Sequence, residues 1–566
     1  MASEEVGEPE PITATERDDW LLEPWTPRPW VSAALLGLAG FVIYLFDTGP
    51  DLTPWRAAAT AFVAFASLTL AVTFAPDREK SSLIFSALAG LVIAGIAWRV
   101  ASAGERYAAS EFWFAAGLLA VGLALPLFQA GFHRLRWRTS YKTAHFHVWT
   151  DAISVAGAAA FTLLSWALIW LLAALFELIQ ISLLRELVAE DWFGLTFAGT
   201  AFGTALGTLR NQLRILGTLQ SVVMLVFSLL AVPLAVALAI FLIAVIFSGL
   251  DVLWEATRSA TPVLLAISVG CFVLVNAVVR DERADMSGSR IMRIAARILA
   301  LGILPLTIFA AVSMGTRIAQ HGLSPERIWS LIAIAVGVAY GVGYFVAVLR
   351  GWRGEWDERL RRANMHLAVV TCVIAFVLAL PIVDFGAISA RNQIARLNSG
   401  AVSAEDFDYA ALRWDFGDAG RRALQRLSER GGGIGEQAQA MLEREERFPV
   451  TLGGRYAGTT EISYDFADPE LRKWVAAHIG EQPWLCEGSC VALDLGTSGE
   501  RRRVALVTRN GVEQVSFRAD GVPDPPPAPE VAPPREGALT AEDVELREFT
   551  GRRVYVDGKP VGAPFE

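Results

Sequence analysis

Long apolar stretches dominate this chain and restrict what it can fold into. Nine stretches of about 17 to 27 mostly apolar residues are each long enough, at about 1.5 Å of helix per residue, to cross a hydrocarbon core of ~30 Å. They are residues 30–46, 57–75, 82–98, 112–132, 152–178, 259–279, 292–313, 328–349 and 367–390. We therefore predict helical membrane spans, because lipid offers the backbone no hydrogen-bonding partners.

Two more stretches have two interpretations. Residues 192–209 are moderately apolar and rich in glycine, and residues 218–250 are long for one span, with Pro233 near the middle. Either each stretch crosses once, or the first lies aside while the second folds into a hairpin. Both alternatives add two crossings, which gives eleven in all.

The distribution of basic residues predicts the orientation, because Lys and Arg near span ends are retained in the cytoplasm. With the N-terminus inside, the inner loops hold 18 Lys and Arg residues and the outer loops hold 7. The segment after the last span is then outside. Residues 1–29 are acidic, unlike a secretory signal, and we predict a disordered cytoplasmic tail.

The predicted fold is an all-α polytopic transmembrane bundle at residues 30–390 with a small periplasmic α+β domain at residues 391–521. A capping-box pattern at Ser403–Asp406 predicts a short helix, and further helices are expected from Asp418 toward Arg430 and at residues 469–479. Alternation predicts strands at residues 491–495, 503–508 and 512–518. A proline-rich linker, residues 522–536, and a hairpin tail, residues 537–566, follow.

Known functional motifs are scarce. The net charge of −9 excludes nucleic-acid binding driven by overall charge. HExxH, the GxxxxGK[ST] phosphate loop and the GxSxG elbow are all missing from the sequence. We therefore expect no nucleic-acid partner, no cofactor and no metal, and the balance is against an enzyme.

Two local patterns in the predicted outer domain have alternatives. Cys486 and Cys490 favour a small-loop disulfide in an oxidising compartment over a metal site, because no histidine lies at ligand spacing. Asp494 and Gly496 partly match a calcium loop, but the bidentate glutamate is missing, and a plain hairpin loop is the preferred interpretation.

Ionisable residues near the membrane are the candidate site residues. Glu177, Asp251, Glu255 and Asp384 all fall at predicted outer ends of spans. They either line an outward-facing cavity or form ordinary ion pairs with basic residues nearby, and the second alternative is favoured. Asn276 lies deeper, and we expect it to form a helix-to-helix hydrogen bond rather than to bind a ligand.

Small residues at four-residue intervals predict close helix packing, because they let backbones approach. The spacing occurs at Gly199, Gly203 and Gly207, and again at Gly337 and Gly341. Pro233, Pro305 and Pro381 interrupt spans, as in proteins that move or house a cavity.

Several stretches between about residues 141 and 427 resemble a family of uncharacterised bacterial inner-membrane proteins, the domain of unknown function 4153. These stretches are Phe176–Ile179, Gly249–Glu255, Gly322–Trp329, Asn392–Leu397 and Glu405–Tyr409. The resemblance implies a multi-pass protein of a bacterial inner membrane and implies no activity.

Three functions remain. The favoured one is a non-catalytic scaffold or sensor that binds an envelope protein through residues 391–566. The second is a transporter or channel-like protein with a cavity among kinked helices, and the third is a membrane-embedded enzyme acting on lipid or envelope glycan. The oligomeric state is not predicted.

Overall fold

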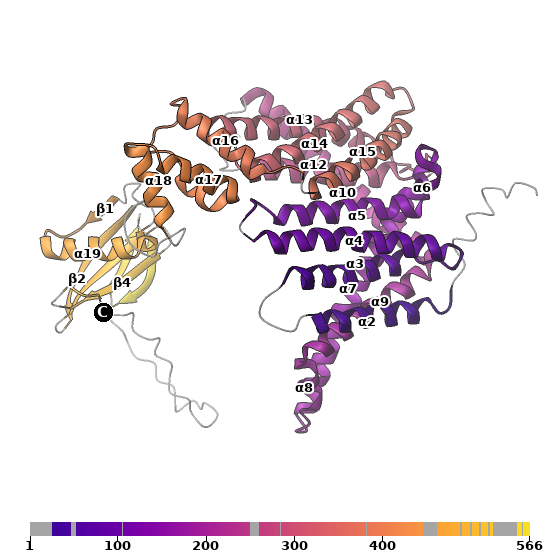
Figure 1. Ribbon diagram of the computed structural model, residues 1–566, viewed down its shortest axis with the longest axis horizontal. Coiled ribbons are helices and arrows are strands. Elements are labelled where there is room, and N and C mark those ends of the chain that lie inside the picture. Colours follow the sequence, from indigo (N-terminus) through magenta and orange to yellow (C-terminus); the bar gives the residue numbers. More distant parts are fainter. Residues whose placement is uncertain are drawn as a thin grey trace, which may run out of the picture. The chain divides into compact units, whose positions relative to one another are not determined.

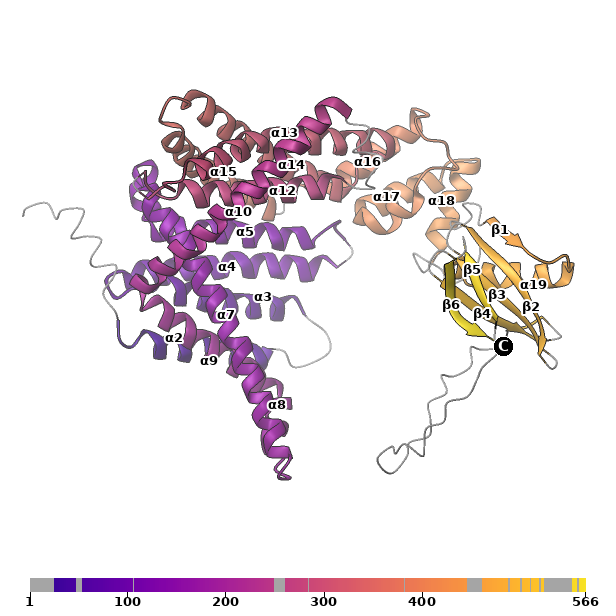
Figure 2. The ribbon, with the colours of Figure 1, turned by 180° about the vertical axis from the view of Figure 1, so that it is seen from behind.

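The computed structural model describes residues 25–46, 53–104, 106–248, 260–283, 285–380, 382–444, 461–486, 489–498, 501–508, 511–518, 521–523, 552–556 and 559–565. The chain forms two compact units, Met1–Glu443 and Arg444–Glu566. The first unit is helical, and the second combines a helix with strands (Figures 1 and 2). The predicted class, a polytopic helical bundle with a small α+β domain, is confirmed.

The helical unit contains long helices joined by short connections. Its apolar helices are α2 (Arg28–Phe46), α3 (Pro54–Thr73), α4 (Glu79–Ala103), α5 (Glu111–Gln129), α7 (Tyr141–Glu177), α9 (Asp191–Arg210), α10 (Leu213–Ser248), α12 (Ala260–Val279), α13 (Arg290–His321), α14 (Pro325–Arg350) and α15 (Trp356–Ala379). Short helices α6 (Phe132–Leu135) and α8 (Leu183–Ala189) lie between them. In the described residues, ten of these helices are long and apolar enough to span a membrane.

Helix α9 is the candidate for the remaining predicted crossing. It is not among the ten, but it runs antiparallel to α2 along its length: Gly207 lies at Pro29, Gly203 at Ser32 and Gly199 at Leu36. Helix α10 continues through Pro233 as one 36-residue helix, so the hairpin alternative is wrong. That each of the two stretches crosses once stays a prediction.

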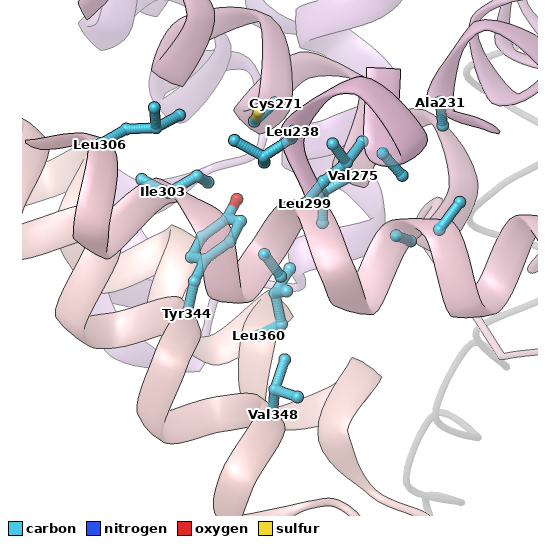
Figure 3. Packing of buried hydrophobic residues seen from close by; sticks show 14 of the residues in the cluster. Ala231, Leu238, Cys271, Val275, Leu299, Ile303, Leu306, Tyr344, Val348 and Leu360 are labelled. Atoms are coloured by element: carbon cyan, nitrogen blue, oxygen red, sulfur yellow. The ribbon is translucent and has the colours of Figure 1, made fainter. Parts of the chain in front are cut away.

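The apolar helices form two adjoining groups. Helices α2, α3, α4 and α5 lie side by side, with α7 running obliquely across them (Figures 1 and 2). Helices α10 and α12 to α15 form the second group, and its buried core includes Leu299, Ile303 and Leu306 of α13 beside Tyr344 of α14 (Figure 3). Helices α5 and α15 pack together and join the groups.

The last span ends earlier than predicted. Helix α15 stops at Ala379, and a separate helix, α16 (Phe385–Asn398), begins after Asp384, whose carboxylate accepts a hydrogen bond from the Ala387 amide at 2.9 Å. The apolar run to residue 390 concealed this break. Pro381, which was predicted to interrupt a span, lies outside the described residues.

Beyond α16, two more helices complete a structure that we name the cap, α16 to α18. The cap contains the short π-helix η3 (Ala411–Asp415), α17 (Gly417–Ser428) and α18 (Gly433–Glu443). The helix predicted to open at Ser403 is wrong: the Ser403 hydroxyl does accept from the Asp406 amide, at 3.1 Å, but the chain makes a turn there. Residues 391–443 therefore belong to the helical unit, whereas the predicted domain boundary lay before them.

The second unit is a four-stranded sheet with a helix packed on it. The sheet order is β1 (Glu461–Tyr464), β2 (Ser489–Ser498), β3 (Arg501–Thr508) and β4 (Gly511–Phe517), with β1 parallel to β2 and the other pairs antiparallel. Asp468 caps α19 (Pro469–Glu481), and this helix packs Leu471 and Val475 against the sheet. Strands β5 (Arg552–Val556) and β6 (Lys559–Phe565) form the predicted final hairpin.

Candidate functional site

The two predicted outer acids that the structure describes, Glu177 and Asp384, have different partners. Glu177, at the end of α7, forms an exposed ion pair with Arg185 of α8. Asp384 caps α16. Asp251 and Glu255 lie outside the described residues. The two acids that are described therefore have local structural partners, and neither is seen to line a cavity.

The predicted glycines bring backbones into close contact. A Cβ atom at Gly199 or Gly203 would overlap the carbonyl oxygen of Leu36 or Ser32 on α2, and one at Gly207 would lie 2.7 Å from the Pro29 Cα. On α14, Gly337 and Gly341 face α13 in the same way: a Cβ at Gly341 would lie 2.8 Å from the Leu304 Cα, and one at Gly337 would lie 3.0 Å from the Thr307 methyl.

Asn276 belongs to a ring of hydrogen bonds between four spans. Its amide donates to the hydroxyl of Tyr344 at 2.7 Å, Tyr344 donates to the amide oxygen of Asn364 at 2.6 Å, and Asn364 donates back to Asn276 at 2.6 Å. Tyr141 of α7 joins through its hydroxyl, which accepts from Asn364 at 3.2 Å. None of these four side chains has a buried polar atom left without a partner. The ring therefore satisfies itself and links α7, α12, α14 and α15.

Two buried ion pairs at span ends were missed by the sequence reasoning. Asp151 of α7 pairs with Arg210 of α9, and both side chains are only about a tenth exposed. At the start of α15, buried Asp357 pairs with Arg361 at 3.1 Å, and Arg361 also donates to the last carbonyl of α12, Val279, at 2.9 Å. Charged residues next to the apolar stretches are visible in the sequence. The sequence does not show which of them form ion pairs with one another.

The second unit contains the two local patterns seen in the sequence, the pair of cysteines and the partial match to a calcium loop. Cys486 and Cys490 form a disulfide between the short helix η4 (Pro483–Cys486) and the start of β2.

Asp494 accepts a hydrogen bond from the Gly496 amide at 2.9 Å, in a bulge where Gly496 has φ of 88°. The Asp494 carboxylate also pairs with Arg502 at 2.7 Å. These hydrogen bonds from Arg502 lower the pKa of the Asp494 carboxyl below its ordinary value. The loop is a hairpin, as predicted. Among the described residues, no cluster of three or more His, Cys, Asp or Glu side chains is arranged to hold a metal ion.

The stretch Asn392–Leu397 fixes the cap to the bundle. Arg396 donates to the carbonyls of Ala319 at 2.9 Å and Gln320 at 2.7 Å, at the end of α13. Gln393 donates to the carbonyl of His321 at 2.8 Å, and the side-chain oxygen of Asn392 accepts from the Leu323 amide at 2.8 Å. These side chains satisfy carbonyls that a helix end leaves open, so α16 is held against the α13–α14 loop.

A second contact fixes the other side of the cap. The Asp418 amide at the start of α17 donates to the carbonyl of Arg106, in the α4–α5 connection, at 2.8 Å. Gly417, with φ of 60°, leaves no room for a Cβ beside that carbonyl. The cap is therefore attached to two connections of the bundle, through α16 and through α17.

Between α16 and α17 lies a groove of about 440 Å³. Alanines and larger apolar side chains form its floor, and four arginines with Asn398 supply its polar lining. The groove is lined by Ala387, Ala390, Arg391, Ile394, Ala395, Asn398, Ala419, Arg422, Ala423, Arg426, Leu427 and Arg430. The lining contains no carboxylate. It is thus an apolar channel with a strongly basic rim.

Comparison with known proteins gives a family but no closer relative. The model of the domain of unknown function DUF4153 matches residues 57–427, from α3 to α17, so the cap helices that form the groove lie inside the match and the second unit lies outside it. No curated protein and no solved structure matches the chain. Since the match covers well over half of the sequence and follows the bundle and its cap, the chain belongs to the DUF4153 family.

Proposed function

We propose that this integral membrane protein is a non-catalytic scaffold or sensor of a bacterial inner membrane, which binds an envelope protein through residues 391–566. The observation that carries the proposal is the attachment of the cap. Asn392, Gln393 and Arg396 fix α16 to the α13–α14 loop, and Asp418 fixes α17 to the α4–α5 connection. A partner bound to such a cap would be held in a fixed position on the spans.

The second unit supplies a surface for the same role. Its sheet buries one face beneath α19, while Val491 of β2 is 40% exposed. The unit has its own apolar core and a disulfide, so it can present that face independently of the bundle.

Photo-crosslinking in cells tests the scaffold role. A crosslinking amino acid at Val491 should capture a specific envelope protein, and a purified partner should bind the full chain more tightly than a chain that ends after Glu443 and keeps only the cap. A matched crosslinker at Leu83, an exposed position on α4, serves as the control. Equal binding by the full and shortened chains contradicts a role for the second unit.

A transporter is the second candidate, and one observation favours it: the ring of Tyr141, Asn276, Tyr344 and Asn364 places polar groups between four spans. Substrate-dependent flux in proteoliposomes that is lost in Asn276→Leu would establish transport. Absence of flux across ions and metabolites would leave the ring with a packing role.

A further inference from the structure

We propose that the groove between α16 and α17 binds the headgroup of an anionic phospholipid, with the phosphate held by Arg391, Arg422 and Arg426. Lipid binding here is independent of the scaffold role. Nothing else known of the chain assigns a ligand to this groove.

The charge of the groove favours an anionic ligand. Arg391, Arg422, Arg426 and Arg430 line it, and none of them has an ion pair among the described residues. The nearest carboxylate on α17, Asp418, pairs with Arg421 at 2.7 Å and attracts Arg422 without forming an ion pair with it. Convergent guanidinium groups repel one another, and a phosphate that bridges them removes this repulsion.

The side chains are also oriented for such a ligand. The Nε atom of Arg391 donates to the Ala387 carbonyl at 3.1 Å, and the Nε atom of Arg426 donates to the Arg422 carbonyl at 3.2 Å. Each bond fixes one edge of a guanidinium to its own helix and leaves the terminal nitrogens available. Arg430 is engaged differently, because it donates to the side-chain oxygen of Asn398 at 2.8 Å.

The floor of the groove suits the uncharged part of a lipid. Ala387 and Ala390 on α16 face Ala419 and Ala423 on α17, and these small side chains leave the space open. Its volume of about 440 Å³ falls in the range of small-molecule sites, roughly 300 to 1,000 Å³. A glycerol backbone and the first part of an acyl chain can lie on this floor while the phosphate meets the rim.

The position of the groove favours a lipid over a soluble anion. Helix α15 ends at Ala379, and Arg391 is the seventh residue of α16. At about 1.5 Å of rise per residue, Arg391 lies at most ~9 Å beyond the start of α16. The headgroup layer adds roughly 5 to 7 Å to each side of the hydrocarbon core, so an arginine side chain can reach it.

The test uses the full-length protein in nanodiscs of phosphatidylcholine, with or without phosphatidylglycerol. Native mass spectrometry measures the retained lipid, and thermal unfolding measures stabilisation. Wild type should retain phosphatidylglycerol preferentially and melt at a higher temperature when it is present. The triple variant R391Q/R422Q/R426Q should lose about tenfold or more in affinity, because hydrogen bonds to charged groups are removed.

Two further variants separate the explanations. Ala419→Leu fills the groove without changing the charge and should weaken the same lipid, as should the single variant Arg422→Gln if the triple variant does not fold. Arg413→Gln removes a charge from the cap outside the groove lining and should behave as wild type. Unchanged binding by the triple variant, or an equal loss in Arg413→Gln, overturns the proposal.

A parallel experiment with soluble phosphate compounds distinguishes a lipid ligand from free phosphate. Inorganic phosphate and glycerol 1-phosphate are added to the protein in phosphatidylcholine nanodiscs. We expect much weaker stabilisation than with phosphatidylglycerol, because both lack the acyl chain that lies on the alanine floor and inorganic phosphate also lacks the glycerol backbone. Equal stabilisation by inorganic phosphate would overturn the lipid assignment.

Discussion

Single residues at the span ends determine how charge is accommodated in this bundle. Asp151 and Arg210 are nearly buried and pair with each other across α7 and α9. Removing one partner leaves a charge in a poorly solvating site, whereas removing both removes the desolvation cost together with the attraction.

Asp151→Leu and Arg210→Met should each destabilise the protein by about 3 to 5 kcal/mol, and the double variant should regain most of that loss. Thermal unfolding in detergent of wild type, the two single variants and the double variant measures the coupling free energy between Asp151 and Arg210. The exposed pair Glu358–Arg362 on α15 is the matched control, and Glu358→Leu should have little effect. Additive losses at Asp151 and Arg210 would mean that the two side chains do not depend on each other.

Asp494 gives the second unit a predictable pH dependence. Its folded-state pKa is lowered by Arg502, so the stabilisation is present above the unfolded-state value of about 3.9. It is lost as the pH falls through the lower, folded-state pKa. Asp494→Asn should therefore cost about 1 to 2 kcal/mol at pH 7 and nothing at the lowest pH.

Pulse proteolysis of the full chain across urea concentrations measures this effect at each pH. Asp465→Asn, an exposed change in the same unit, is the control and should follow wild type throughout. A constant difference between Asp494→Asn and wild type from pH 7 down to pH 2 would contradict a role for the ionised carboxylate.

At the level of elements, the contact between α2 and α9 depends on glycine. Gly203→Ala adds a methyl group against the Ser32 carbonyl oxygen, which is backbone and cannot rotate away. We expect a loss of about 1 to 3 kcal/mol in unfolding free energy, because the two helices must separate. Thermal unfolding in detergent provides the measurement.

Gly95→Ala on α4 is the matched control, since nothing lies within 4 Å of its Cβ position. That change should leave stability unchanged or raise it, because alanine favours helix by up to about 1 kcal/mol over glycine. If both variants melt at the same temperature, close backbone approach does not stabilise the α2–α9 pair.

At the scale of the whole molecule, whether α9 crosses the membrane decides if the two termini lie on the same side of it or on opposite sides. Ten of the described helices qualify as spans by length and composition, and we expect α9 to add one more because it packs antiparallel along α2. An odd number of crossings places the N-terminus and the C-terminus on opposite sides. With the basic residues retained inside, the N-terminus is expected in the cytoplasm and residue 566 outside.

Reporter fusions measure this topology. Alkaline phosphatase, which is active only outside the cytoplasm, should be active after Glu566 and after Arg185 and inactive after Arg283. The fusions after Arg185 and Arg283 bracket α9, α10 and α12. Activity after Arg283, or inactivity after Glu566, would show that α9 does not cross.

The sequence by itself determined the features that depend on neighbouring residues. Span length and apolar character follow from local composition, and the helix at residues 469–479 and the hairpin at Asp494 follow from side chains a few residues apart. The break between the end of α15 at Ala379 and the start of α16 at Phe385 is also local, but the apolar run to residue 390 concealed it in the prediction.

The tertiary structure decided which distant residues meet. The pairing of Asp151 with Arg210, the ring around Asn276 and the attachment of Arg396 to the end of α13 each join segments at least 59 residues apart. The groove likewise exists only because α16 and α17 are held side by side. Hydrophobic burial favours any apolar helix in lipid equally, so the sequence predicts that a helix spans the membrane, while packing and paired polar groups determine its neighbours.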